Sequence, residues 1–379
     1  MQEEFTIIVL GFERLYSIQR LLYSLVQAGK AWNSNKPIPL IISLDFGNIP
    51  EVEHFCSNFF SKYFICSVRL HEKKLGVDEH NLWAMAQSEN SQAVMVLEDD
   101  MMVSPSLFHY TAAALGFFSN DGNIAGISLY NYMRNEACNY PFWKRMDGND
   151  CYFYQKASSR GLVITKQQWI DFKNIEKEGN IPDLPAQVKR WPNEVWEKKF
   201  NTYLVLTGKF WAYPQISYTT NFGEIGVHVK NSIFRHAFQS AMQNGVQTQF
   251  KFTHSHKSSA VYDAYGEPAY ITGYSNQEIT SDIFGIRDLN HIKTKYVLTS
   301  RYCTNSVEGY ALDLIPAELN IEANLRGHDL MVTEVKYIRE NFIQKQRRLL
   351  KLHYYFYPDK GLLHLLRLKS LEIINRIRI

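Results

Sequence analysis

The sequence predicts an α/β fold in which a mostly parallel sheet is covered by helices. Throughout residues 5–115, apolar runs of strand length alternate with stretches whose apolar residues recur at helical spacing. That alternation is typical of parallel sheets with crossover helices. The continuous apolar run at residues 93–97 suits a strand that is buried on both faces. The chain has 379 residues, 45% of them hydrophobic, so it can bury a large core.

The expected elements follow one another along the chain, with turn residues between them. They are strands at residues 5–10, 39–47, 65–70, 93–97 and 123–128, and helices at residues 16–26 and 75–87. Arg14 and Asp45 come directly after the first and second strands. Because parallel strands end at the same edge of a sheet, both side chains are expected to face one crevice. An ordinary surface ion pair is the alternative.

Three carboxylates, Glu98, Asp99 and Asp100, follow the apolar run without a break. They would repel one another strongly unless a positive charge lay between them. A hard divalent cation, Mg²⁺ or Mn²⁺, held through a carboxylate and substrate phosphates would remove the repulsion. The carboxyl end of a strand is also where open α/β sheets bind their ligands. The alternative is an acidic turn whose aspartates cap the next helix.

Two common phosphate-binding motifs are absent from the sequence. No Gly-x-Gly-x-x-Gly follows the first strand, and no Gly-x-x-x-x-Gly-Lys-Ser/Thr occurs. A dinucleotide-binding Rossmann site and a P-loop are therefore disfavoured. Residues 11–14 are not a glycine-rich phosphate loop either, which disfavours a sugar-phosphate nucleotidyltransferase. The remaining expectation is a nucleotide-binding domain whose ligand contacts are side chains at strand ends.

Positive charge is concentrated at the end of the chain. Residues 345–379 carry nine Lys and Arg against two acids, a surplus of +7, whereas the whole chain has a net charge of +3. This distribution argues against a nucleic-acid-binding domain, whose charge would cover a folded face. The segment fits an interfacial helix on an anionic membrane surface, and it fits a packed C-terminal helix with a basic edge almost equally well.

The start of the chain and its cysteines bear on localisation. Neither a signal peptide nor an uncharged apolar stretch of membrane-spanning length is recognisable. The five cysteines have no Cys-x-x-Cys spacing. A cytoplasmic protein, with or without peripheral association with the cytoplasmic membrane face, is therefore expected.

Residues 96–108, which contain Glu98-Asp99-Asp100, resemble the Glu-Asp-Asp segment of the N-acetylglucosaminyltransferase I family. That family consists of inverting, metal-dependent glycosyltransferases of the GT-A fold, and the resemblance extends over residues 5–235. It implies that Asp100 holds Mn²⁺ or Mg²⁺ and that Glu98 and Asp99 bind hydroxyls of the donor sugar and ribose. Arg14, Asp45 and His80 match the family residues that hold the uridine and its ribose.

Two further segments are similar to the same family. Residues 190–200 contain Trp191-Pro192 and then Trp196-Glu197, which resembles the family pattern around the catalytic base. Glu197 would be that base, although the family has aspartate there, and a solvated helix residue is the alternative. Pro192 suits the first turn of the helix. His228 stands where the family has a serine near the donor phosphates.

The predicted function is a metal-dependent inverting glycosyltransferase. It would move a sugar from a nucleotide sugar, a UDP-sugar such as UDP-GlcNAc, to a hydroxyl of a glycan or lipid-linked acceptor. The expected organisation is a GT-A catalytic domain at residues 1–235, a mixed part at 236–330 and a basic helical extension at 331–379. A non-catalytic subunit that binds a nucleotide sugar or carbohydrate is the alternative, favoured by the departures at Glu197 and His228.

Overall fold

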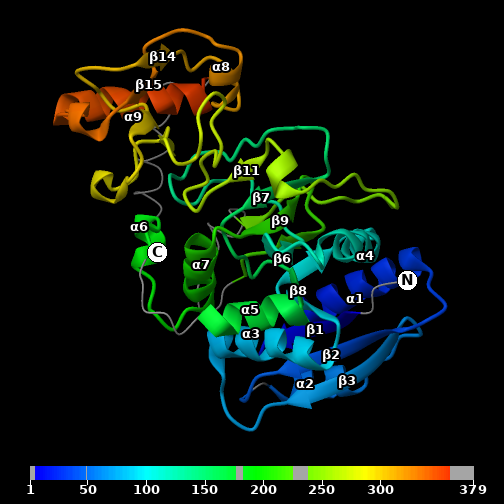
Figure 1. Cartoon of the computed structure of the whole chain (residues 1–379). Coiled ribbons are helices and arrows are strands. Elements are labelled where there is room, and N and C mark those ends of the chain that lie inside the picture. Colours follow the sequence, from blue (N-terminus) through cyan, green and yellow to red (C-terminus); the bar gives the residue numbers. More distant parts are fainter. Residues whose placement is uncertain (1–4, 48, 176–181, 225–237, 359–379) are drawn as a thin grey trace. The chain divides into compact units, whose positions relative to one another are not determined.

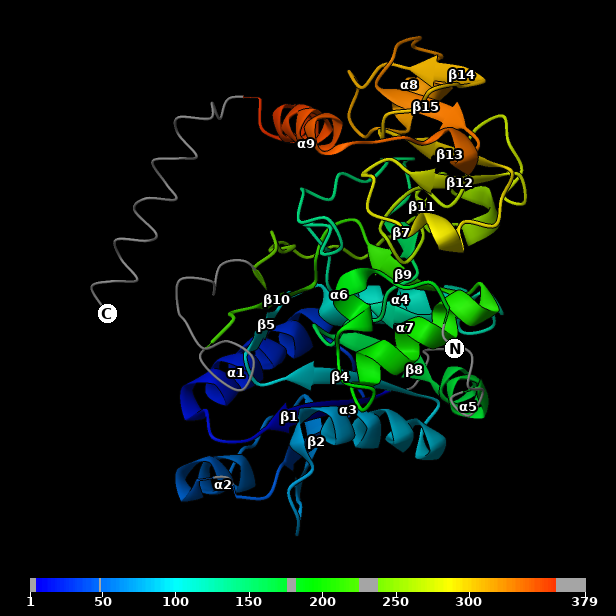
Figure 2. The same ribbon diagram turned by 90° about the vertical axis from the view of Figure 1, so that its left-hand side faces the viewer.

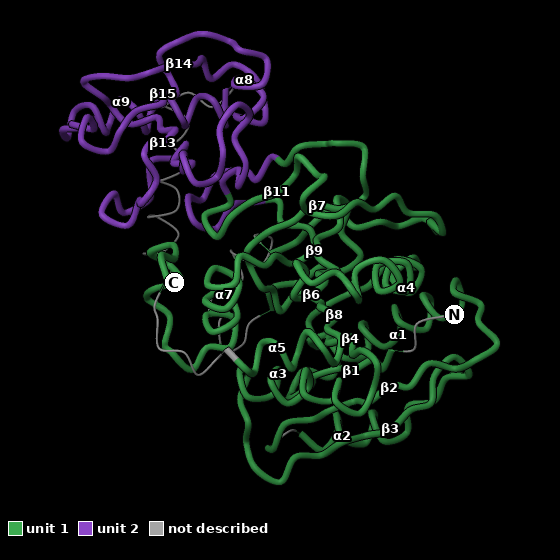
Figure 3. The backbone as a smooth tube through the Cα atoms, in the orientation of Figure 1, with its two compact units in different colours: residues 1–133, 144–266 green, residues 134–143, 267–379 purple. Residues whose placement is uncertain are grey.

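The computed structural model describes residues 5–47, 49–175, 182–224 and 238–358 (Figure 1). The chain divides into two compact units, one of residues 1–133 and 144–266, the other of residues 134–143 and 267–379 (Figure 3). No helix within the described ranges is long and apolar enough to span a bilayer. The functional division expected at residues 235 and 330 stays a prediction.

A mixed sheet forms the core of the first unit. Among the described residues, nine strands are hydrogen-bonded in the order β11-β7-β9-β6-β8-β4-β1-β2-β3. Their bounds are β1 Phe5–Gly11, β2 Ile38–Leu44, β3 Phe64–Leu70, β4 Ala93–Glu98, β6 Ile124–Ser128, β7 Cys151–Tyr154, β8 Leu162–Thr165, β9 Phe210–Pro214 and β11 Val261–Tyr262. The strands β1 to β4 are parallel to one another, whereas β8 runs antiparallel to both neighbours, β4 and β6.

Helices cover both faces of this sheet. Their bounds are α1 Leu15–Trp32, α2 Pro50–Ser57, α3 Gly76–Ala86, α4 Leu107–Phe118, α5 Lys166–Ile175, α6 Ala186–Lys189 and α7 Trp196–Thr207, with short 3₁₀ turns at Gln87–Asn90 and Ser255–Lys257. Figure 2 shows α1 and α2 on one side of β1 and β2, and α3 on the other. Right-handed crossovers require this, because the chain moves outward through β2 and β3 and then returns past β1 to form β4.

Most expected elements of this unit are confirmed, including the parallel sheet, its helical layers and the buried acidic strand. The expected place of Pro192 in the first turn of a helix is wrong. Helix α7 begins at Trp196, and Pro192 lies in the preceding turn, where its carbonyl accepts from the N–H of Val195 (3.3 Å). The N–H of Trp196 donates to the carboxylate of Asp78 in α3 (3.0 Å), which fixes where α7 starts.

A small sheet and a helix make up the second unit. The strands β12 Ile279–Asp282, β13 Tyr296–Thr299, β15 Leu330–Thr333 and β14 Glu308–Tyr310 pair in that order, with α8 Leu319–Glu322, α9 Phe342–Phe356 and 3₁₀ turns Leu289–His291 and Val335–Tyr337. The helical extension is confirmed as α9, which begins at Phe342, whereas β15 occupies residues 330–333. Leu352 and Phe356 of α9 lie in the core of this unit, and Tyr140 stacks on Phe356 (centroids 4.5 Å apart).

Candidate active site

The acidic residues lie at the point where the strand order of the sheet reverses. Strands β1 and β4 are neighbours, but the chain forms β2 and β3 on the other side of β1 before it returns to β4. Leu10 of β1 pairs with Glu98 of β4, and the N–H of Asp99 donates to the carbonyl of Leu10 (2.9 Å). Ligands of open α/β sheets bind outside the carboxyl ends of the strands at such a switch point.

Arg14 joins the end of β1 to the acids that follow β4. Its guanidinium contacts both carboxylate oxygens of Asp99, through Nη2 and Nε, and its Nη1 lies 3.3 Å from Oδ2 of Asp100. The Arg14 side chain keeps 31% of its surface exposed, whereas that of Asp99 keeps 4%. One guanidinium therefore faces two aspartates at the carboxyl ends of β1 and β4.

Asp100 is held from a second direction by the strand β10 (Thr219–Asn221), which pairs with β5 (Met101–Val103). The side-chain amide of Asn221 donates to Oδ1 of Asp100 (2.8 Å). The N–H of Phe222 donates to the backbone carbonyl of Asp100 (2.9 Å). These bonds fix the direction of the carboxylate, and the sequence analysis did not identify Asn221.

Glu224 is a further acid of the site that the sequence analysis missed. Its carboxylate accepts from the hydroxyl of Ser17 and from Nη1 of Arg20 (2.8 Å). The Arg20 guanidinium lies 3.7 Å from the centre of the Phe222 ring. Three polar residues at the start of α1 are spaced three apart, namely Arg14, Ser17 and Arg20. That spacing puts them on one face of the helix and could have indicated a polar partner such as Glu224.

Burial and mutual repulsion raise the pKa values of the clustered acids. The pKa of Asp99 is raised to about 6 by burial, which outweighs the opposing effect of Arg14, and Asp100 raises it further. Burial, then Asp100, raises the pKa of Glu98 well above its usual value, although the amide of Asn81 donates to its carboxylate (3.1 Å). Burial likewise raises the pKa of Asp100. The site thus disfavours the ionised form of these acids, and a bound positive charge would restore it.

A cluster of buried acids whose ionised forms lack sufficient compensation fits a cation. Among the described residues, no group of three or more His, Cys, Asp and Glu side chains is arranged to hold a metal on its own. A Mg²⁺ or Mn²⁺ site completed by substrate phosphates needs only one or two protein carboxylates. Asp100 meets that requirement, because its carboxylate is directed by Asn221 and retains 12% exposure.

Asp45 follows β2 and is bonded to backbone groups. Its carboxylate accepts from the N–H groups of Phe46 (2.8 Å), Leu75 (2.8 Å) and Gly76 (2.9 Å). Burial raises its pKa, but these three backbone donors lower it more, so the net shift is downward. Asp45 therefore fixes the loop that opens α3 at the edge of the crevice.

His80 lies in α3 and points at β2. It is 5% exposed, and its Nε2 lies 2.7 Å from the hydroxyl of Ser43. The same hydroxyl lies 3.0 Å from Nε2 of His71, and the two imidazole rings meet edge to face. Burial, and then the charge of His71, lowers the pKa of His80 to about 4. The imidazole is therefore neutral at physiological pH.

The depressed pKa of His80 predicts a loss of stability in acid. Its pKa is about 4 in the folded chain and 6.5 when unperturbed, so the unfolded chain binds the extra proton first. The contribution of neutral His80 to the free energy of unfolding is complete above pH 6.5. It is lost as the pH falls from 6.5 to 4, a loss on the order of 3 kcal/mol. Urea unfolding at pH 7 and pH 4.5 measures the fall. His80→Gln should show a smaller fall, whereas His54→Gln on exposed α2 should match the parent. Equal falls in the parent and His80→Gln would contradict the assignment.

Glu197 comes from α7, far along the chain from the acids that follow β4. It lies in the first turn of α7, and its Oε1 accepts from the N–H of Ser159 (3.1 Å). Burial and then Asp100 are the main causes of the raised pKa of Glu98, and the charge of Glu197 adds to them, so Glu197 lies within electrostatic range of Glu98. His228, the remaining expected donor contact, lies outside the described residues.

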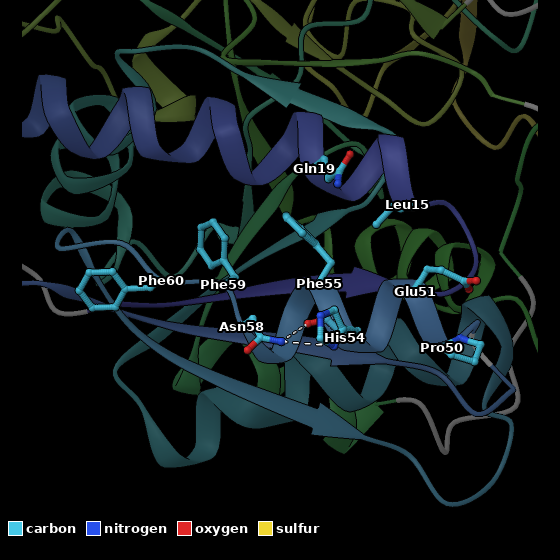
Figure 4. A pocket seen from close by; sticks show the side chains of 9 residues that line it. All are labelled: Leu15, Gln19, Pro50, Glu51, His54, Phe55, Asn58, Phe59 and Phe60. Carbon is cyan, nitrogen blue, oxygen red and sulfur yellow. Dashed lines mark hydrogen bonds between the residues drawn. The ribbon is translucent and has the colours of Figure 1, made fainter.

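A second hollow lies apart from these residues, between α1 and α2. Figure 4 shows Phe55, Phe59 and Phe60 along it, with His54 hydrogen-bonded to Asn58. Its volume is about 700 Å³, and Leu15, Gln19, Pro50 and Glu51 complete its lining. None of the expected site residues lines this hollow.

No protein-family model matches the chain. No curated protein matches it either. Solved structures that resemble it include S. aureus TarS 1–349 in complex with UDP-GlcNAc (12% identity, TM-score 0.36, covering 60% of this chain and 61% of that one). GalNAc-T7 with UDP, GalNAc and Mn²⁺ is 11% identical, with a TM-score of 0.37 over 56% of this chain and 41% of that one. The mannosyltransferase PcManGT from Pyrobaculum calidifontis with GDP-Man and Mn²⁺ is 10% identical, with a TM-score of 0.33 over 57% of this chain and 59% of that one. The matches span less than two thirds of each of these chains. At such TM-scores, the fold is argued from the strand order itself.

Proposed function

We propose that this chain is a metal-dependent glycosyltransferase that transfers a sugar from a nucleotide sugar, with inversion, to a hydroxyl of a glycan or lipid-linked acceptor. The observation that carries the proposal is the cluster of Glu98, Asp99 and Asp100 at the switch point of the sheet, where Arg14 and Asn221 hold the two aspartates. The three clustered carboxylates suit a bound cation. The carboxylate of Glu197, which the N–H of Ser159 orients, suits a base.

The donor would lie over the ends of β1 and β4. Asp100 would hold Mn²⁺ or Mg²⁺, which when bound neutralises the charge that develops on the departing nucleoside diphosphate. Glu98 and Asp99 would accept hydrogen bonds from hydroxyls of the donor sugar and ribose. Arg14 would lie beside the phosphates, because it already spans the two aspartates at the mouth of the crevice.

Asp45 and His80 would shape the nucleoside end of the donor site. Asp45 fixes the backbone of Leu75 and Gly76, and His80 presents a neutral ring beside Ser43. We propose that His228 contacts the donor phosphates. Donor specificity for UDP-sugars, and for UDP-GlcNAc among them, is part of the proposal.

Glu197 would act as the general base. Its carboxylate would take the proton of the acceptor hydroxyl while that oxygen forms a bond to the anomeric carbon. The bond from the anomeric carbon to the phosphate oxygen breaks on the opposite face, and the nucleoside diphosphate leaves with its electron pair. The hydrogen bond from the N–H of Ser159 orients the carboxylate of the base.

The location of the protein and its membrane partner are also proposals. Within the basic segment, Arg348 of α9 is paired with Glu340 (2.7 Å) and packs in the second unit. Residues 359–379 lie outside the described residues. We propose a cytoplasmic protein whose basic segment associates with the anionic face of the membrane.

A donor screen tests the function directly. Nucleotide sugars are added to the full chain with Mn²⁺ or with EDTA, and thermal unfolding and release of free sugar are measured. One donor should raise the Tm by binding the folded state and should be hydrolysed slowly, with both effects lost in EDTA. Stabilisation without any hydrolysis or transfer would favour the non-catalytic binding subunit. No response to any nucleotide sugar would contradict both functions.

A further inference from the structure

Helix α7, which carries the proposed base, has no capping side chain directly before it. Glu197 lies in its first turn, where the backbone N–H groups have no partner within the helix. Such groups are usually capped by a Ser, Thr, Asp or Asn side chain at the residue before the helix. Val195 occupies that position here, and it makes no side-chain capping bond. The first turn of α7 therefore depends on an acceptor from elsewhere in the chain.

Asp78 supplies that acceptor from a distant helix. It lies in the first turn of α3, and its Oδ1 accepts from the N–H of Trp196 (3.0 Å). Trp196 is 2% exposed, and its ring meets that of Phe200 edge to face, so the start of α7 is anchored in the core. A backbone N–H beside a buried side chain is costly to leave without a partner. Asp78 thus fixes the turn in which Glu197 lies.

The same helix, α3, also contacts the donor end of the proposed site. The loop that opens α3 donates two N–H groups to Asp45. One turn later, His80 is hydrogen-bonded to β2, and the amide of Asn81 donates to Glu98 (3.1 Å). Asn81 is 1% exposed, so α3 packs closely against β4 at this point. One short stretch of α3 therefore joins the nucleoside end, an acid of the Glu-Asp-Asp cluster and the helix of the base.

We propose that Asp78 is a positioning residue, which sets the distance between the base and the donor by holding α7 against α3. This inference rests on the proposed function. A base has to stand within hydrogen-bond reach of the proton that it takes, and a misplacement of about 1 Å can lower the rate about 10²-fold. In this role Asp78 touches neither donor nor acceptor and acts through the position of Glu197. Loss of the bond to Trp196 should therefore lower turnover and leave donor affinity unchanged.

Two substitutions at Asp78 test this role in the full chain. Asp78→Ala removes the acceptor, whereas Asp78→Asn keeps a side-chain oxygen for the N–H of Trp196. The assay is the Mn²⁺-dependent hydrolysis of the nucleotide sugar that the donor screen selects, with water as the acceptor. Asp78→Ala should lower kcat by about 10- to 100-fold, with a KM for the donor within about twofold of the parent value. Asp78→Asn should recover most of the lost turnover.

A double-mutant cycle with Glu197→Gln shows whether Asp78 acts through the base. The Gln side chain cannot accept the proton, so its exact position no longer affects the rate. Adding Asp78→Ala to Glu197→Gln should therefore cause no further fall in kcat. Equal falls in the parent and in the Glu197→Gln background would overturn the inference, because Asp78 would then act on the fold or the donor instead of the base.

Amide hydrogen exchange gives a readout that needs no substrate. In Asp78→Ala, the peptide that contains Trp196 should exchange faster than in the parent, because the first turn of α7 opens more often. In Asp78→Asn, the same peptide should exchange at the parental rate. If Asp78→Ala does not fold, adding Val195→Ser supplies a local cap, and the same comparison is made on that pair with Val195→Ser alone as its reference.

Glu79→Ala is the matched control, because it removes the other carboxylate from the first turn of α3 at an exposed position. It should match the parent in kcat, KM and exchange. An unchanged kcat in Asp78→Ala, beside an active parent, refutes the positioning role and upholds the proposed function. A parent that hydrolyses no nucleotide sugar refutes the proposed function, and this inference falls with it.

Discussion

Asp100→Asn is expected to lower sugar transfer by at least about 10³-fold while the protein stays folded. The amide cannot supply the anionic oxygen that a divalent cation requires, so Mn²⁺-dependent binding of the nucleoside diphosphate should be lost as well. The fold should tolerate the change because Asn221 can still donate to the side-chain oxygen at this position. Removing one charge also relieves the repulsion that raises the pKa of Glu98.

The measurements are transfer rate, Mn²⁺-dependent nucleotide affinity and thermal unfolding, each on the same preparation. Glu51→Gln, which removes an exposed carboxylate from α2, is the control and should match the parent in all three. Transfer that persists in the parent after exhaustive EDTA treatment would exclude Asp100 as a required metal ligand.

Glu197→Gln is expected to lower turnover by about 10²–10⁴-fold and to leave donor affinity nearly unchanged. The amide oxygen can keep the hydrogen bond from Ser159, so the helix and the loop should hold their positions. What is lost is the ability to accept a proton from the acceptor hydroxyl. Steady-state kinetics, together with nucleotide titration, separate the effect on turnover from the effect on donor binding.

Two further variants sharpen this prediction. Glu194→Gln, at an exposed position three residues earlier, should be as active as the parent. Glu197→Asp should lose most activity, because the hydrogen bond from the N–H of Ala157, in the loop before β8, to Asn201 limits how far α7 can move toward the acceptor. A fully active Glu197→Gln would show that the base must be sought elsewhere in the chain.

Local sequence patterns predicted the half of the site that depends on strand ends. The apolar run of β4 and the alternation before it predicted Glu98, Asp99 and Asp100 at the end of one strand and Arg14 at the end of another. In the structure, Arg14 contacts both aspartates. The alternative in which the aspartates cap the next helix is wrong, since α4 begins at Leu107. Residue propensities and the spacing of apolar residues were sufficient here, because each predicted strand and its end depend on residues that are neighbours in the sequence.

The parts that the sequence analysis missed depend on contacts between distant segments. Asn221 reaches Asp100 through the pairing of β10 with β5, and nothing in the residues near Asn221 indicates that pairing. The start of α7 was misplaced because Asp78 of another helix accepts the N–H of Trp196.

The reversed direction of β8 has a consequence for how such a site can diversify. Leu162, the first residue of β8, pairs with Val96 near the carboxyl end of β4, so the loop that enters β8 meets the acids that leave β4. A parallel strand in this place would have sent that loop to the far edge of the sheet. In the proposed function, the loop between β7 and β8 lies beside the base, so acceptor and donor recognition would be encoded in separate stretches of the gene. Substitutions between β7 and β8 would then change the acceptor, while the residues that follow β1 and β4 would continue to bind the same donor.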